Sequence, residues 1–314
     1  MCWKHVIALF DVLDDPAATG ERVLETFKLF EACDISTSLT TIEGARGRVD
    51  FVHILIPGKR GRTLGGDAPT LGIIGRLGGI GARPERIGFT SDGDGALAAL
   101  SAARKLAEMH VRGDVLEGDV IITTQICPTA PTRPHEPVPF MDSPVPSAVS
   151  NEHEVDPAMD AILTIDTTKG NRILNARGVA VTPTVRDGWI LRVCEPALDI
   201  LSTVTGRLPL VLPVTMQDIT PYGNDVYHLN SILQPSVATR APVIGVAITT
   251  VSQVAGCATG ASHLTDVEEA ARFAVETAKA YTAGRCPFND ETEYRRILEL
   301  YGSMAHLRTM GEKA

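Results

Sequence analysis

The sequence predicts an α/β protein with three layers, in which a mostly parallel central sheet carries helices on both faces. Short apolar runs alternate along the chain with longer segments of helical period, the order of elements expected for that class. Several runs are apolar at consecutive positions, as in strands that are buried on both sides. The chain has 314 residues, enough to bury a large core, and we expect one domain over residues 1–314.

Each element is predicted from its period and its boundaries. The apolar run 6–10 predicts a strand, which Asp11 and the acidic turn before Pro16 end, and the periodic segment 17–32 predicts an amphipathic helix. Apolar runs between turn residues predict further strands at 51–56, 71–74, 120–124, 161–165, 179–181, 189–193, 208–213 and 243–249. Helical spacing predicts helices at 95–110, 197–205, 224–233, 266–282 and 290–304.

The segment 127–157 lacks a period and is rich in Pro, Ser and Glu. We therefore expect a long loop, which serves as a lid or as an oligomer contact.

Composition excludes several classes of function. The formal net charge of -9 argues against a nucleic-acid surface and leaves metals, cations and neutral substrates open. No apolar run approaches the length of about twenty residues that spans a membrane, and the first run is too short for a signal peptide. The six cysteines are scattered without a Cys-x-x-Cys pair, so we expect reduced thiols and a cytoplasmic protein.

The segment 90–95, Thr-Ser-Asp-Gly-Asp-Gly, opens the predicted helix 95–110. A carboxylate at the start of a helix faces unpaired backbone N–H groups and stays ionised, and the glycines leave room beside it. Asp92 is therefore suited to a divalent cation. A plain helix cap is the alternative interpretation.

Further metal-binding groups stand near the ends of predicted strands, where ligands bind in α/β sheets. They are His53, Asp166 and His263. Together with Asp92 they form a nitrogen and oxygen donor set that suits zinc, with manganese or cobalt as alternatives. Each residue alone is also explained as a core, turn or cap residue.

The same segments resemble the co-catalytic zinc peptidases, and most closely their tetrahedral-aminopeptidase branch. The similarity runs in the correct order over residues 49–283, and over its whole length the chain also resembles domain-of-unknown-function family 1177. The similar segments are 51–53, 91–100, 120–125, 161–166, 223–229 and 241–264.

The resemblance implies a ligand set and an altered active site. One metal would be held by His53, Asp92 and Asp166, and a second by Asp92, Cys127 and His263. The Glu-Glu pair of the peptidases is replaced by Ile126, which cannot act as general base, and by Cys127, which could bind a metal only as a thiolate. The His-x-Asp motif has also lost its carboxylate, because Leu55 occupies that position.

Our leading hypothesis is a metal-dependent hydrolase of a small amide or a short peptide-like substrate, with one metal site, two or none. The general base would then come from Glu136, His135 or Asp225. The resemblance also implies a homo-oligomer.

Two alternatives stay open. The first is a binding or structural protein on a degenerate zinc-peptidase scaffold. The second is a metal-free enzyme with Cys127 as nucleophile and His53 or His263 as base. The glycine-rich segment 75–81 predicts a tight turn near the pocket, with Arg76 as an anion contact.

Overall fold

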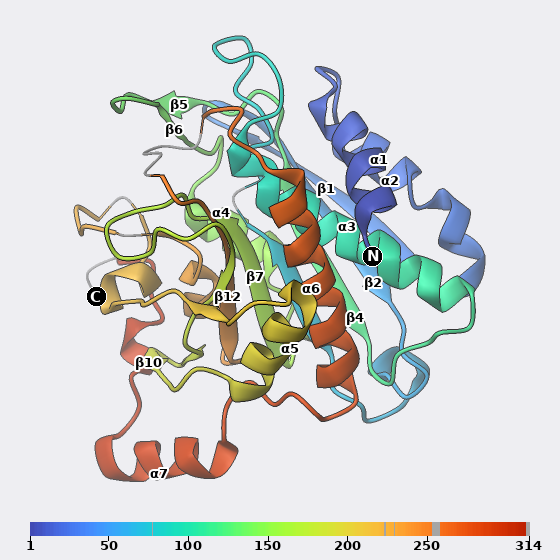
Figure 1. Ribbon diagram of the computed structural model, residues 1–314, viewed down its shortest axis with the longest axis vertical. Helices are drawn as coiled ribbons and strands as arrows, with labels where there is room; N and C mark the ends of the chain where they lie inside the picture. The colour runs from blue at the N-terminus through green and yellow to red at the C-terminus, as the bar shows by residue number, and fades with distance from the viewer. Residues whose placement is uncertain (77, 223, 229, 253–257, 312–314) are drawn as a thin grey trace.

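The computed structural model describes residues 1–76, 78–222, 224–228, 230–252 and 258–311 (Figure 1). Its centre is a mixed sheet whose strands follow the order β1-β2-β4-β3-β7-β12-β8-β11. These strands are β1 (Ser36–Gly44), β2 (Gly47–Ile56), β3 (Leu71–Gly75), β4 (Val120–Ile126), β7 (Ala161–Thr167), β8 (Gly178–Val181), β11 (Leu210–Val211) and β12 (Val243–Thr249). Short pairs are formed by β9 (Val185–Arg186) with β10 (Trp189–Ile190), and by β5 (Thr132–Arg133) with β6 (Phe140–Met141).

The four strands in the middle, β4, β3, β7 and β12, are parallel to one another. Their neighbours β2 and β8 are antiparallel to them. The carboxyl ends of the four central strands therefore meet at one edge of the sheet, which we call the carboxyl edge.

Helices cover the sheet on both faces, which confirms the predicted fold class. On one face lie α1 (Trp3–Asp14), α3 (Asp94–Val111), α5 (Glu195–Thr205) and α6 (Leu264–Thr282). The other face carries α4 (Ser147–Glu154) and the 3-10 turns η4 (Met216–Ile219) and η5 (Gln234–Val237). The remaining helical segments are α2 (Gly20–Glu25), α7 (Glu291–Tyr301), η1 (Lys28–Cys33), η2 (Arg62–Leu64), η3 (Ser91–Gly93) and η6 (Ala305–Leu307).

Side chains along the central strands alternate between two apolar clusters, one on each face of the sheet. Ile73 and Leu163 belong to the large apolar cluster under α3 and α6, whereas their neighbours Ile74 and Ile162 belong to the cluster on the opposite face. Successive strand residues point to opposite faces, so consecutive apolar residues are needed where both faces are covered.

Two element predictions were wrong and others were incomplete. Residues 6–10 lie inside α1, where Val6, Leu9 and Leu13 are buried at helical spacing. Within the described part of 224–233 there is no α-helix. The segment 17–32 is broken into α2 and η1, and 127–157 contains β5, β6 and α4 rather than one continuous loop.

No helix in the described ranges is both long and apolar enough to cross a membrane.

Candidate functional site

Two of the predicted metal ligands meet at the carboxyl edge. Asp166 is the sixth residue of β7, and Asp92 lies in η3, directly before α3. The hydroxyl of Thr167 donates a hydrogen bond to the carbonyl of Ser91, which ties the end of β7 to η3. Asp92 and Asp166 are both buried, with 3% and 2% of their surface exposed. The structure thus places an acidic pair at the start of a helix and the end of a strand.

The electrostatics of this pair favour the arrival of a positive charge. Burial raises the pKa of Asp166 well above its usual value, and the negative charge of Asp92 raises it further. The guanidinium of Arg76 opposes this shift, as do hydrogen bonds from the backbone N of Thr167 (2.7 Å) and the Oγ of Ser231 (3.2 Å). Since these groups do not offset the effect, a proton or a cation at the pair would stabilise the site.

A second charged group lies beside the pair. Asp94, the first residue of α3, is fully buried, and Lys169 Nζ lies 3.5 Å from its Oδ2. Its Oδ1 accepts a hydrogen bond from Ser262, and Lys169 also donates to the carbonyl of Ala261 at 3.0 Å. Burial raises the pKa of Asp94 to about 6, while Lys169 pulls it down. Sequence reasoning missed Lys169, although its position three residues after Asp166 was a signal.

Arg76 follows β3 and forms an ion pair with Glu154 at the end of α4. Only 1% of Arg76 and none of Glu154 is exposed. The predicted role of Arg76 as a contact for an external anion was therefore wrong: its counter-ion comes from the chain itself. Its charge still acts on the site, because it lowers the pKa of Asp166.

Two glycines allow the close packing of this site. A Cβ at Gly95 would lie 2.3 Å from the carbonyl oxygen of Ile165, so only glycine lets α3 start so close to β7. A Cβ at Gly79 would lie 2.8 Å from Oδ2 of Asp92 and 2.9 Å from Cε of Met141. The turn around Gly79 therefore closes over the carboxylate of Asp92.

His53 lies away from the pair. In β2 it stands opposite Thr123, three residues from the position opposite Ile126 at the carboxyl end of β4. Two strands, β4 and β3, separate β2 from β7, which corresponds to about 14 Å at the usual strand spacing. Its Nε2 lies 3.0 Å from a carboxylate oxygen of Asp156. The expected convergence of His53 with Asp92 and Asp166 does not occur.

Cys127 and His263 do not join the pair either. The thiol of Cys127 donates to the carbonyl of Arg48 at 3.4 Å and packs in the small apolar cluster with Phe51. Burial raises the pKa of this thiol, which disfavours a thiolate. His263 is an exposed residue at the N-cap of α6. Across the ranges that the structure describes, no three His, Cys, Asp or Glu side chains converge to hold a metal ion.

None of the three candidate bases is buried, unlike the acidic pair. Glu136 and Asp225 are both exposed loop residues. The Nδ1 of His135 donates a hydrogen bond to the carbonyl of Val138 at 3.0 Å, and the ring packs on Phe140. Ile126 is 1% exposed and belongs to the large apolar core.

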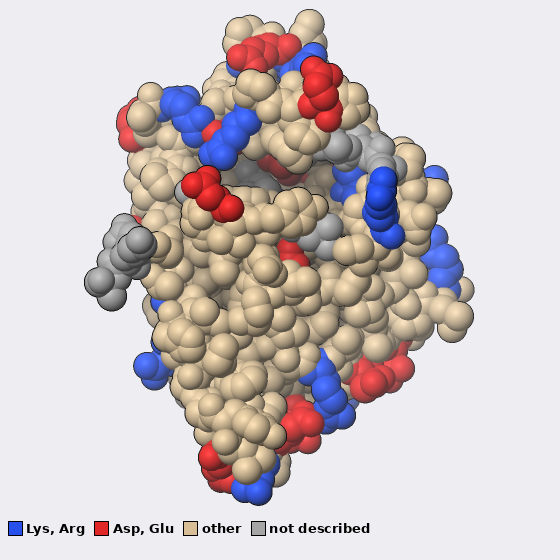
Figure 2. Space-filling view, turned by 90° about the vertical axis from the view of Figure 1, so that its left-hand side faces the viewer, with Lys and Arg blue, Asp and Glu red and all other residues tan. Residues whose placement is uncertain are grey.

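The surface is hollowed below the β5–β6 hairpin, and acidic side chains are visible inside the hollow (Figure 2). In Figure 1, α3 begins at the same height in the molecule as this hollow.

Comparison with known proteins identifies the fold. The solved structure of the bottromycin maturation enzyme BotP in complex with Mn is similar at 14% identity, with a TM-score of 0.53, and the match covers 89% of this chain and 70% of that one. A mutant of tomato leucine aminopeptidase matches at 14% identity with a TM-score of 0.50, over 87% of this chain and 61% of the aminopeptidase. A second structure of BotP matches at 15% identity with a TM-score of 0.50, over 90% and 70%.

At this level of identity the likeness shows a common fold, and it confirms the expected peptidase-like architecture. None of the curated proteins compared with the chain matches it significantly. Residues 40–311 match the family described as protein of unknown function (DUF1177), and the chain belongs to that family.

Proposed function

We propose that the protein is a divalent-metal-dependent hydrolase of a small amide or peptide-like compound, with Asp92 and Asp166 as its metal ligands. One observation carries the proposal: two buried carboxylates lie together at the carboxyl edge, and the negative charge of Asp92 raises the pKa of Asp166 beyond the effect of burial. The shared fold with BotP in complex with Mn and with a leucine aminopeptidase supports this class of reaction.

The donor set fits some metals better than others. Two carboxylates supply only oxygen, whereas zinc sites generally use three or four protein ligands that include nitrogen or sulfur. Mg²⁺ and Mn²⁺ accept one or two carboxylates and complete their shell with water or substrate. We therefore favour Mn²⁺ or Mg²⁺ over the zinc expected from the sequence. When bound, such an ion supplies a Lewis acid that polarises a carbonyl and lowers the pKa of water.

The residues around the pair orient the carboxylate of Asp166, and one of them can accept a proton. Thr167 and Ser231 hold the carboxylate of Asp166 through hydrogen bonds, as outer groups around metal ligands do. Asp94, with a pKa of about 6, is suited to exchange a proton near neutral pH, and we propose it as proton acceptor in place of Glu136 and Asp225. Lys169 and Ser262 fix its orientation.

A second candidate function, a non-catalytic binding protein, is favoured by Ile126. The resemblance to the zinc peptidases implies that Ile126 replaces their general base, and the side chain lies in the apolar core. A metal-free thiol enzyme has less support, because Cys127 is 2% exposed and its thiol points to Arg48.

Hydrolysis of aminoacyl p-nitroanilides and dipeptides, measured with and without Mn²⁺, tests the proposal. We expect turnover that requires Mn²⁺ and falls about 100-fold or more in Asp92→Asn and Asp166→Asn. Asp199→Asn, a matched change on the exposed face of α5, should leave turnover unaltered. Turnover that persists in both site variants would refute the assignment, and Mn²⁺ binding without any turnover would favour the binding protein.

A further inference from the structure

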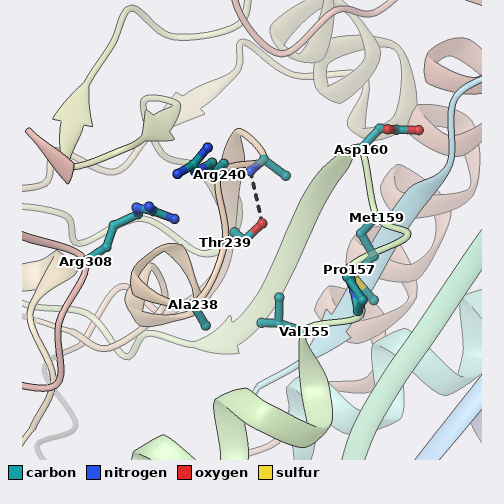
Figure 3. Close-up of a pocket in the computed structure, with 9 residues that line it drawn as sticks. Val155, Pro157, Met159, Asp160, Ala238, Thr239, Arg240 and Arg308 are labelled. Carbon is teal, nitrogen blue, oxygen red and sulfur yellow. Dashed lines mark hydrogen bonds between the residues drawn. The ribbon is translucent and has the colours of Figure 1, made fainter. Parts of the chain in front are cut away.

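A pocket of about 560 Å³ is drawn in Figure 3. It lies at the amino ends of β7 and β12, the opposite edge of the sheet from the acidic pair. Asp160 and Ala241 line it, and they stand just before β7 and β12 respectively. Asp166 lies six positions after Asp160 along extended strand, which corresponds to about 20 Å. The pocket is thus a place distinct from the proposed active site.

Two arginines from distant parts of the chain project into this pocket. The side chains of Arg240 and Arg308 point toward one another (Figure 3). Arg308 Nε lies 3.0 Å from an oxygen of Asp187, so part of its charge is already compensated. Arg240 is exposed and has no ion-pair partner within the described part of the chain.

The one acidic residue in the pocket lining does not neutralise Arg240. Asp160 accepts a hydrogen bond from Arg62 Nη2 at 2.6 Å through one oxygen and from the backbone N of Thr70 at 2.8 Å through the other. The charge of Asp160 is therefore paired with Arg62 rather than with Arg240. The chain as a whole carries a net charge of -9, from which a negative surface would be expected. The positive charge of this pocket is therefore a local feature.

We propose that this pocket binds a small organic anion, with Arg240 as the main anchor and Arg308 as the second. A guanidinium presents paired N–H donors that match the oxygens of a carboxylate or a phosphate. Two guanidinium groups that face each other are held together best by an oxyanion between them. Val155, Pro157 and Met159 add an apolar wall, so the ligand carries an apolar portion next to its anionic group. The volume lies in the range of small-molecule sites.

Calorimetric titration of the full chain with phenyl phosphate, benzoate and inorganic phosphate tests the inference. We expect saturable binding of phenyl phosphate or benzoate, and the stronger of the two identifies the anionic group. Inorganic phosphate should bind more weakly than phenyl phosphate because it lacks the apolar part.

Variants then assign the site. Arg240→Met should weaken binding by about tenfold or more, the loss expected for a hydrogen-bonded charge. Arg295→Met removes an exposed arginine of α7 and should leave binding unchanged, as should Asp166→Asn in the proposed active site. Absence of saturable binding of all three probes, or equal binding by Arg240→Met, would overturn the inference. Because Asp166→Asn keeps this pocket intact, the outcome is independent of the proposed hydrolase activity.

Discussion

Replacement of Glu154 by Gln is expected to destabilise the protein strongly. The change removes the negative partner of Arg76, and both side chains are almost completely shielded from water. The Arg76 guanidinium would then remain as a buried, uncompensated charge. Removal of one member of a buried ion pair costs about 3–5 kcal/mol, so we expect the free energy of unfolding to fall by that amount.

The double variant Arg76→Met with Glu154→Leu separates the charge effect from packing. Both charges disappear together, and apolar groups of similar volume fill the space, which is often neutral or stabilising. We therefore expect the double variant to recover most of the loss. Burial already raises the pKa of Glu154, which indicates that the buried charge is costly even beside Arg76.

Urea unfolding followed by circular dichroism provides the measurement. The control is Glu299→Gln, which breaks an exposed pair with Arg296 and should change the free energy of unfolding by less than about 1 kcal/mol. If Glu154→Gln is as stable as this control, or if the double variant is less stable than the single one, the unpaired charge of Arg76 does not destabilise the protein.

Three further outcomes follow from single positions. Gly95→Ala should lower the midpoint of thermal unfolding by several degrees, because its Cβ would lie 2.3 Å from a backbone oxygen of Ile165; an unchanged midpoint would contradict the close approach. His5 has its pKa lowered to about 4 by burial, so the unfolded chain takes up its proton near pH 6.5 and the folded chain does not. Stability should therefore be full above about pH 6.5 and fall toward pH 4, and His5→Gln should flatten urea midpoints over that window. Native Cys127, at 2% exposure and with its pKa raised, should react with iodoacetamide more slowly than the partly exposed Cys33, as peptide mass spectrometry would record; faster labelling of Cys127 would revive the thiol mechanism.

Much of the fold follows from local sequence pattern. The strands β3, β4, β7 and β12 are apolar on both faces, a pattern that period analysis recognises. By contrast, β1 is rich in Ser and Thr and mostly exposed or half-buried at the sheet edge, so it offers little apolar signal. The run 6–10 is too short for its period to distinguish strand from helix, and only burial against α3 and α6 decides in favour of α1.

Only part of the candidate site was predictable from the sequence, because the rest depends on the tertiary structure. Asp92 and Asp166 stand at a helix start and a strand end, which are local features of the sequence. The position of His53 depends on strand order and on the antiparallel register of β2 against β4, which no local pattern encodes. The pairing of Arg76 with Glu154 joins β3 to α4 and likewise needs the tertiary structure.

We propose that Asp92 and Asp166 together bind a divalent cation, and the hydrolase depends on this. Calorimetric titration of Mn²⁺ into chelator-treated protein tests it most directly. We expect saturable binding by the wild-type chain and by Asp199→Asn, with a loss of about tenfold or more in affinity in Asp92→Asn and in Asp166→Asn. Equal Mn²⁺ affinity in all four proteins, or no binding by the wild-type chain, would contradict it.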